Sequence, residues 1–285
     1  MPDAEAIETP SGKGAADENF PVGSWLLPAR LRRHIAAFYA YARAIDDIAD
    51  NPQLEPSEKI RRLEGFAQAV SGARTDDAAY RTAHDIRRSL AETGVTHRHC
   101  VDLTRAFKQD AVKRRYADWG ELMDYCNFSA APVGRYLIDL HRESGSAYEP
   151  ADALCNALQV LNHLQDCADD YRTLDRAYLP GDWMCEAGAN LEMLREPAAP
   201  PALREVFNRC LDATEALLLS ANPLAGRLRS ARFAMESAAI VAIAWKLSAE
   251  LRRRDPVAER VELSRMQFAG CVMRGIGGVL LARNG

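Results

Sequence analysis

The chain has 285 residues, with 36 Lys and Arg against 40 Asp and Glu, and a formal net charge of −4. Its 48% hydrophobic and 27% charged residues are near the averages of globular proteins, which excludes wholesale disorder. The acidic balance argues against a nucleic-acid binder, because such proteins usually gather Lys and Arg on one face. Seven cysteines, an odd number with no C-x-x-C pair, predict neither a disulfide framework nor a zinc ribbon and favour a reducing compartment.

The beginning of the chain does not predict an export signal. Residues 1–16 contain several acidic side chains and no continuous apolar segment, so we expect a mobile tail there. From Pro28 onward, Ala, Leu, Arg and Glu dominate and alternating β-branched runs are scarce, which predicts helices almost throughout. No low-complexity linker divides the chain, and we expect one all-α domain over residues 17–285.

Periodic apolar residues place the expected helices along the chain. The first follows Pro28 and stops at Asn51, because Pro52 disfavours helical geometry in the residue before it. We expect a loop-rich stretch between residues 178 and 201, where several Pro and Gly occur. The further helices are predicted near residues 56–70, 77–93, 97–112, 118–141, 150–171, 200–220 and 228–254, with one more after 258.

Polar side chains form a stripe on the first predicted helix. Tyr39, Arg43, Asp46 and Asp50 follow one another at spacings of four, three and four residues, beside the apolar face of the same helix. The carboxylates of Asp46 and Asp50 stand one turn apart and repel each other. Arg43 relieves part of that repulsion, and a divalent cation would relieve more.

A second acidic stripe is predicted on the helix over residues 150–171. Asn162, Asp166 and Asp170 are four residues apart and share one face. A single Asp-rich face is usually solvated surface, but Mg²⁺ prefers such hard oxygen ligands and takes its remaining ligands from water and substrate phosphates. Two stripes that faced each other on antiparallel helices would form a funnel for Mg²⁺ and diphosphate.

Four segments resemble the squalene/phytoene synthases, in the order of that family. They are Y-A-Y-A-R-A-I-D-D-I-A-D (39–50), Y-C-N-F-S-A-A-P-V-G-R (125–135), L-Q-V-L-N-H-L-Q-D-C-A-D-D-Y (158–171) and R-A-Y-L-P (176–180). The resemblance implies an all-α isoprenoid-synthase fold, a helical bundle around a central cavity. Segments 18–22, 131–135 and 162–166 are most similar to the family members that form hydroxysqualene on the bacterial route to hopanoids.

The resemblance also implies roles for individual residues. Those expected to bind the metal are Asp46, Asp50, Asn162, Asp166 and Asp170. Those expected to act in catalysis are these five with Tyr39, Arg43 and Tyr125, the two tyrosines lying near the reacting carbons. Those expected to bind substrate are Asn19, Phe20, Arg43, Pro132, Gly134 and Gln159.

Two departures from the family pattern bear on the reaction. Gln165 stands where most members have Arg, which removes one positive charge and favours an enzyme that consumes one diphosphate rather than two. Pro132 lacks an N–H, so we expect a bend there that frees the Phe128 carbonyl. That carbonyl could hold a water molecule; the alternative is a kink with consequences for packing alone.

The expected reaction is the Mg²⁺-dependent conversion of presqualene diphosphate to hydroxysqualene, with two or three ions and no nicotinamide cofactor. Residues 275–280 do not complete a G-x-G-x-x-G fingerprint. One of Lys113, Arg114 and Arg115 is expected to meet the diphosphate, with the choice left open. The functional partners expected are a presqualene diphosphate synthase and a squalene-forming oxidoreductase, with no nucleic acid.

Two alternative functions remain open at this point. One is the head-to-head condensation of two farnesyl diphosphates to presqualene diphosphate or squalene. The other is a non-catalytic assembly factor, although such a protein should have lost the carboxylates that this chain retains. We expect a cytoplasmic protein in peripheral contact with the inner membrane, since the product is insoluble. Residues 268–282 are largely apolar but too short to span a bilayer, and we expect a buried terminal helix there, with a helix on the membrane surface as the alternative.

Overall fold

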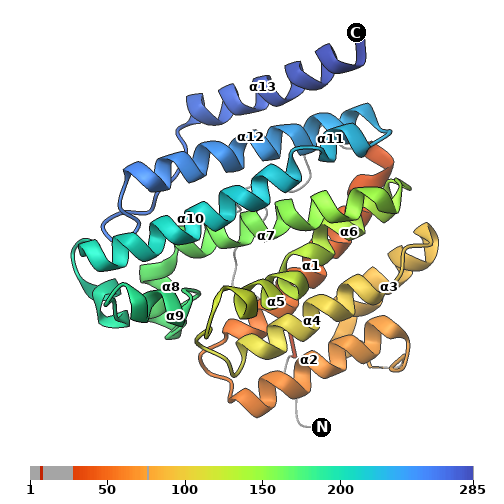
Figure 1. Ribbon diagram of the computed structural model, residues 1–285. Coiled ribbons are helices and arrows are strands. Elements are labelled where there is room, and N and C mark those ends of the chain that lie inside the picture. The colour runs from red at the N-terminus through yellow and green to blue at the C-terminus, as the bar shows by residue number, and fades with distance from the viewer. Residues whose placement is uncertain (1–6, 9–27, 76, 285) are drawn as a thin grey trace. The chain divides into compact units, whose positions relative to one another are not determined.

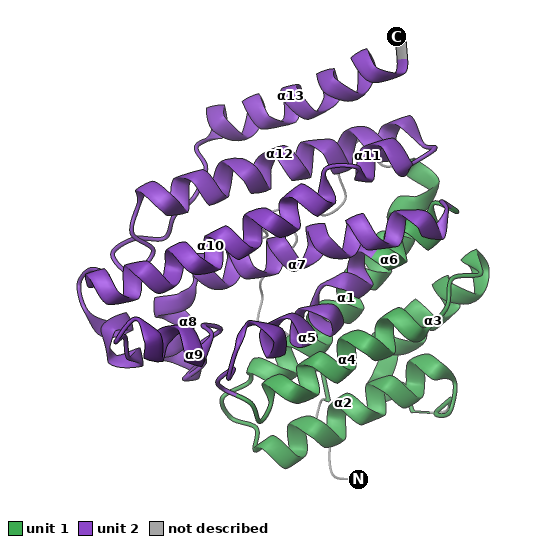
Figure 2. Cartoon of the chain, viewed as in Figure 1, with its two compact units in different colours: residues 1–113, 135–142 green, residues 114–134, 143–285 purple. Residues whose placement is uncertain are grey.

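The computed structural model describes residues 7–8, 28–75 and 77–284, and within these ranges the regular structure is helical (Figure 1). The chain divides into two compact units (Figure 2). Unit 1 comprises residues 1–113 and 135–142, and unit 2 comprises residues 114–134 and 143–285. The expectation of a single domain over residues 17–285 stays a prediction.

The described part of unit 1 begins with four consecutive helices and a 3₁₀ turn. These elements are α1 (Ala29–Asp50), α2 (Pro56–Ser71), η1 (Ala78–Tyr80), α3 (Arg81–Thr93) and α4 (Arg98–Asp110). The helix α6 (Ala131–Leu140) begins in unit 2, and its residues from Arg135 onward belong to unit 1.

The helix α1 buries the face that its sequence predicts. Leu31, Ile35, Phe38 and Ile45 are all buried in the core of unit 1. The helix ends at Asp50, and the next residue has extended backbone, as expected before a proline.

Aromatic side chains hold the core of unit 1 together. Phe38 stacks on Tyr136, with ring centroids 3.9 Å apart. A Cβ atom at Gly65 would lie 2.0 Å from the Tyr80 hydroxyl, so that position of α2 requires glycine. The buried hydroxyl of Tyr41 is 2.6 Å from Thr104 Oγ1, which satisfies both groups.

Two residues of the predicted N-terminal tail contact unit 1. The backbone N–H and the hydroxyl of Thr82 donate to Glu8 Oε1 at 2.9 and 2.7 Å. Arg62, which is almost fully buried, donates to the carbonyl of Ile7 at 3.3 Å. These two residues are therefore anchored, while the rest of the predicted tail lies outside the described residues.

Unit 2 holds the remaining helices, and α7, α10, α12 and α13 lie side by side in that order (Figure 1). Its elements are α5 (Trp119–Ser129), η2 (Gly145–Ala147), α7 (Tyr148–Gln165), α8 (Cys167–Leu174), α9 (Gly181–Glu186), η3 (Leu191–Arg195), α10 (Pro201–Ala221), α11 (Leu224–Arg227), α12 (Ala231–Arg253) and α13 (Arg265–Asn284).

Two of the predicted helices are broken in the structure. The predicted helix over 118–141 is interrupted at Ala130, where α5 ends and α6 begins. Pro132 is the second residue of α6, a position where its missing N–H removes no helical hydrogen bond, and the helix is interrupted two residues before it. The predicted helix over 150–171 is interrupted at Asp166, between α7 and α8.

The stretch from 178 to 201, expected as loop, contains the short elements α9 and η3. It pairs with the segment that precedes α5. The N–H of Ala177 donates to the Arg114 carbonyl, and that of Gly181 donates to the Tyr116 carbonyl, each at 3.0 Å. A Cβ atom at position 181 would lie 3.2 Å from that carbonyl oxygen, so glycine permits the approach. This pairing fixes the position of Tyr116 in unit 2.

Candidate active site

The first acidic stripe lies on α1 as the sequence predicts. Tyr39, Arg43, Asp46 and Asp50 are half-buried, between the core face and the solvent face of the helix. Arg43 Nη1 lies 2.8 Å from Asp46 Oδ2, and its Nη2 lies 2.9 Å from Asp47 Oδ1. The Arg43 side chain is 20% exposed, so water only partly screens these ion pairs.

The carboxyl group of Asp46 lies among like charges. Burial raises its pKa from 3.8 to about 8. The carboxylates of Asp50, Asp110 and Asp47 also raise this pKa, whereas the Arg43 guanidinium lowers it. Asp110, at the end of α4, is itself buried. Four carboxyl groups thus crowd around one guanidinium within unit 1, an arrangement in which a divalent cation would favour their ionised forms.

The second acidic stripe lies at the junction of α7 and α8. The N–H of Asp166 donates to the Asn162 carbonyl at 3.0 Å, and that of Asp170 donates to the Asp166 carbonyl at 2.8 Å. The four-residue spacing therefore continues through the break, although the stripe does not lie on one unbroken helix. The three side chains are half-buried, whereas Asp169 is 74% exposed and pairs with Arg172 at the surface.

A positive charge lies next to this stripe. The Nη2 atom of Arg260 is 3.3 Å from Asp166 Oδ1, and its Nε atom is 3.2 Å from Glu262. Gln165, which replaces the family's usual Arg, is buried and donates its amide N–H to the Val261 carbonyl at 2.6 Å. The charge expected to be missing at position 165 is thus supplied beside Asp166 by a residue distant in sequence.

Four aromatic rings gather in unit 2. The Tyr116, Tyr125 and Tyr178 rings have centroids 5.4 to 5.6 Å apart. The imidazole of His163 lies flat on Tyr178, with centroids 3.5 Å apart. All four side chains are at least nine-tenths buried. We call these four residues the aromatic cluster, and its π faces are suited to an electron-deficient carbon.

The imidazole of His163 is held neutral. Burial lowers its pKa to about 3, and the nearby Arg176 guanidinium lowers it further. The side-chain amide nitrogen of Gln159, one turn earlier on α7, lies 3.1 Å from His163 Nε2. An amide N–H donated there occupies the imidazole lone pair and leaves the proton on Nδ1. The ring then offers a π face without a positive charge.

The basic run before α5 is largely engaged by one carboxylate. Arg114 Nη1 and Arg115 Nη2 lie 2.9 and 2.5 Å from the two carboxylate oxygens of Asp175. The hydrogen bonds from Arg115 and Arg114 hold the pKa of Asp175 below its usual range. Lys113 belongs to unit 1. The expectation that one of these three cations meets diphosphate stays a prediction.

Three residues near the break between α5 and α6 differ in their surroundings, namely Gly134, Pro132 and Ser129. A Cβ atom at Gly134 would lie 2.8 Å from Cys155 Sγ, so glycine allows close packing against α7. Pro132 is buried. The hydroxyl of Ser129, one turn after Tyr125 on α5, is buried and has no hydrogen-bond partner among the described residues. A buried hydroxyl of this kind is a ready site for a water molecule.

The sequence and the structure are similar to a known group of enzymes. The family described as squalene/phytoene synthase matches residues 14–267. The chain belongs to the squalene/phytoene synthase family. It is 42% identical to the hydroxysqualene synthase of Rhodopseudomonas palustris over 92% of this chain and 89% of that one. It is 37% identical to the hydroxysqualene synthase of Zymomonas mobilis over 95% and 91% of the two chains.

Solved structures confirm the expected isoprenoid-synthase fold. The crystal structure of a squalene synthase from Alicyclobacillus acidocaldarius has a TM-score of 0.70 at 28% identity, over 81% of this chain and 87% of that one. A dehydrosqualene synthase has a TM-score of 0.76 over 93% of each chain, and at 19% identity it supports the fold alone. Like other members of this family, the chain is an enzyme of isoprenoid biosynthesis that acts on prenyl diphosphates.

The oxygen groups of the two acidic stripes suit a Mg²⁺ ion that also binds water and substrate phosphate. No cluster of three His, Cys, Asp or Glu side chains that could hold a metal ion occurs within residues 7–8, 28–75 and 77–284. Mg²⁺ typically takes one or two carboxylates and completes its shell with water and substrate phosphates. The crowded carboxylates around Asp46 and the oxygen ligands at Asn162, Asp166 and Asp170 fit that mode of binding.

Asn19 and Phe20, which are expected to bind substrate, lie outside the described residues. Six other residues of the site were not predicted from the sequence. His163 and Tyr178 fall inside the family segments, but nothing in the local pattern predicts that their rings stack. Asp110 stands just before a basic run, and no spacing in the sequence links it to the acidic stripe on α1. The missed residues are Asp110, Tyr116, Ser129, His163, Tyr178 and Arg260.

Proposed function

We propose that the protein converts presqualene diphosphate to hydroxysqualene in a Mg²⁺-dependent reaction without a nicotinamide cofactor. The relatives named hydroxysqualene synthase support the choice of reaction. The structural observation that carries it is the aromatic cluster, in which the buried His163 is uncharged. A protonated imidazole in that place would repel a carbocation, whereas a neutral ring stabilises one through its π electrons.

The two acidic stripes are proposed to bind the diphosphate through metal ions. Asp46 and Asp50 on α1, with Asn162, Asp166 and Asp170 at the α7–α8 junction, are the expected ligands. When bound, Mg²⁺ neutralises the diphosphate and makes it a better leaving group. Arg43 keeps Asp46 and Asp47 oriented, since it bonds to both carboxylates.

The aromatic cluster is proposed to act after the C–O bond breaks. The diphosphate leaves with the electron pair of that bond, and the cyclopropylcarbinyl cation that remains rearranges. The faces of Tyr125, Tyr178 and His163 stabilise this positive charge by about 2 kcal/mol for a well-placed desolvated ring. Because Gln159 occupies the imidazole lone pair, His163 does not take a proton from the cation.

Ser129 is the residue that we propose positions the attacking water. Its buried hydroxyl has no partner among the described residues and stands one turn from Tyr125. The water oxygen forms the new C–O bond, and the proton it loses passes to the released diphosphate. This assignment replaces the Phe128 carbonyl, which the sequence suggested as the water holder.

One observation keeps the condensation of two farnesyl diphosphates as a second candidate. Arg260 lies beside Asp166 and restores the positive charge that Gln165 does not provide. The absence of Arg at position 165 is therefore a weaker argument against a two-diphosphate reaction. A presqualene diphosphate synthase and a squalene-forming oxidoreductase remain the functional partners proposed for the main reaction.

The test is a product assay with purified protein and Mg²⁺ and no nicotinamide cofactor. Farnesyl diphosphate and presqualene diphosphate are supplied in separate reactions, and the products are identified by mass spectrometry. We expect hydroxysqualene from presqualene diphosphate alone. Presqualene diphosphate formed from farnesyl diphosphate would move the protein to the coupling step. No product from either, with no stabilisation by Mg²⁺ and diphosphate in thermal melting, would favour the non-catalytic alternative.

A further inference from the structure

The last helix, α13, has two opposite apolar stripes. Phe268, Val272, Gly275 and Val279 lie at spacings of four, three and four residues. This stripe lies on the side of α13 that packs on α12. A Cβ atom at Gly275 would come within 2.4 Å of the Ala239 backbone nitrogen. The opposite stripe has the same spacing, shifted by two residues. It consists of Met266, Gly270, Met273, Gly277 and Leu280.

The outer stripe faces solvent although it carries no charge. Met266 is 84% exposed, Met273 is 69% exposed and Leu281, next to the stripe, is 78% exposed. With Leu280, four of the seven large exposed hydrophobic side chains of the described residues lie on this one helix. Scattered exposed apolar residues need no explanation, but a continuous stripe on one element marks an interaction surface.

The charges on α13 are all positive. Arg265, Arg274 and Arg283 flank the outer stripe on its two sides, and residues 265–284 contain no Asp or Glu. Arg283 donates to the Leu228 and Arg229 carbonyls. Arg274 is exposed and has no acidic partner among the described residues. Two copies of this helix packed together would bring arginine against arginine, whereas an anionic surface would be attracted to all three.

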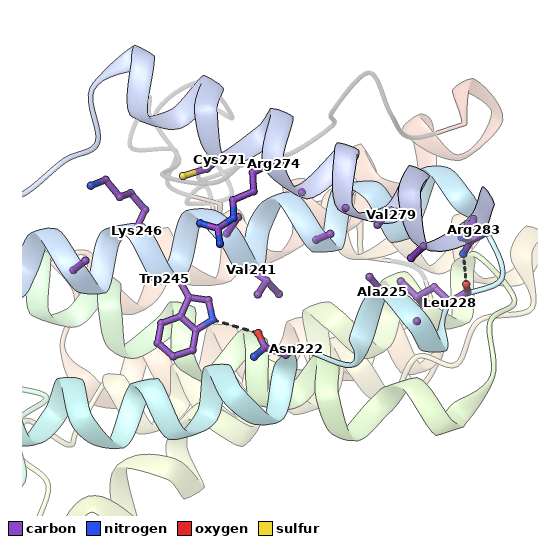
Figure 3. Close-up of a pocket in the computed structure, with 17 residues that line it drawn as sticks. Asn222, Ala225, Leu228, Val241, Trp245, Lys246, Cys271, Arg274, Val279 and Arg283 are labelled. Atoms are coloured by element: carbon purple, nitrogen blue, oxygen red, sulfur yellow. Dashed lines mark hydrogen bonds between the residues drawn. The ribbon is translucent and has the colours of Figure 1, made fainter. Parts of the chain in front are cut away.

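A groove of about 1070 Å³ adjoins the stripe within unit 2. It lies between α13, α12 and the α10–α11 region, and the Arg274 side chain extends from α13 toward the groove (Figure 3). Its lining includes Lys246, Arg274 and Arg283 and no Asp or Glu, although Lys246 also pairs with Glu250 at 2.8 Å. The groove thus places positive charge at the edge of the apolar stripe, where lipid phosphates would lie.

We propose that α13 docks the protein on an anionic lipid bilayer. The outer stripe enters the boundary between headgroups and acyl chains, and Arg274 meets lipid phosphate at the edge of the groove. The helix lies along the surface, because no helix in the described part of the chain is both long and apolar enough to cross a membrane. This inference rests on α13 and the groove beside it, and not on the proposed reaction.

The test is flotation of the full chain with vesicles of phosphatidylcholine, alone or mixed with phosphatidylglycerol. We expect binding to the anionic vesicles that weakens as salt is raised. The double variant Met273→Asp/Leu281→Asp should lower the bound-to-free ratio by at least about tenfold, because charge enters the stripe. Leu219→Asp, at a side chain that is 62% exposed on α10, is the matched control and should bind like the native chain. Arg274→Gln should weaken binding to the anionic vesicles more than to the neutral ones.

Enzymatic activity measured in detergent separates this proposal from the proposed function. In detergent, the α13 variants should be as active as the native chain, whichever product that chain forms. The proposal is overturned if the native chain binds neither vesicle, if the double variant binds as well as the native chain, or if neutral vesicles bind as tightly as anionic ones. A dimer in solution that the double variant dissociates, with no vesicle binding, would assign the stripe to a second copy instead.

Discussion

The imidazole of His163 stacks on the ring of Tyr178, with centroids 3.5 Å apart and planes 9° from parallel. Both side chains are buried, and burial lowers the pKa of the imidazole to about 3. The pair therefore presents π electrons and no positive charge at neutral pH. That property suits an enzyme whose reaction passes through a carbocation.

The first prediction concerns stability as a function of pH. The folded pKa of His163 is about 3 and its ordinary value is 6.5, so the unfolded chain binds more protons between these values. The free energy of unfolding should therefore fall as pH is lowered through this window, by up to about 1.4 kcal/mol per pH unit from this group. His163→Phe, which keeps a ring on Tyr178, should show a smaller fall in denaturant titrations. Parallel curves for the two proteins would contradict the buried neutral histidine.

The second prediction concerns Asp46. Asp46→Asn should lower turnover by at least about a hundredfold, because it removes a proposed metal ligand. Without Mg²⁺ the same variant should be more stable than the native chain at pH 8, by about 1 kcal/mol or more. The pKa of Asp46 in the folded chain is about 8, above its ordinary value of 3.8, so the native chain loses stability as pH rises between these values. An Asn side chain cannot ionise, so the variant does not lose this stability.

The matched control for Asp46→Asn is Asp169→Asn. Asp169 belongs to the second acidic segment but is exposed and paired with Arg172 at the surface. Its substitution should leave turnover within about twofold and stability within about 0.5 kcal/mol. A turnover defect equal to that of Asp46→Asn would mean that the reaction does not distinguish the half-buried stripe from an exposed surface acid.

The third prediction concerns the buried hydroxyl of Ser129. Ser129→Ala removes a polar group that has no partner among the described residues, so stability should stay unchanged or rise slightly. If the hydroxyl positions water, the fraction of alcohol among the C30 products should fall and that of hydrocarbon should rise. Chromatography of the products measures this ratio, and an unchanged ratio would remove Ser129 from the proposed reaction.

The fourth prediction separates packing from substrate binding at Gly134. Gly134→Ala should destabilise the protein by about 1–3 kcal/mol, because the new methyl group would overlap Cys155 Sγ. Adding Cys155→Ala should restore part of that loss in thermal melting. A Gly134→Ala variant with native stability and a raised KM would instead support the expected substrate contact.

The sequence was sufficient for much of the fold and for the acidic stripes. The spacing of Leu31, Ile35, Phe38 and Ile45 specifies the buried face of α1 because a helix repeats every 3.6 residues. The same periodicity places Asp46 and Asp50 beside that face. The break at Asp166 was not predicted, since the hydrogen bonds across it still follow the four-residue pattern.

The remaining parts of the site depend on contacts between distant segments. Arg260 reaches Asp166 from 94 residues further along the chain, and no local pattern links the two. Tyr116 meets Tyr178 because the backbone around Gly181 pairs with the segment before α5. Tertiary contacts of this kind carry no periodic signal in a single sequence.

In the proposed reaction, water captures a cation formed from presqualene diphosphate. The most direct measurement is the reaction of presqualene diphosphate with the purified protein and Mg²⁺ in water labelled with oxygen-18. We expect hydroxysqualene that carries the heavy oxygen, formed without a nicotinamide cofactor. Hydroxysqualene without the label, or a product formed from farnesyl diphosphate but not from presqualene diphosphate, would contradict it.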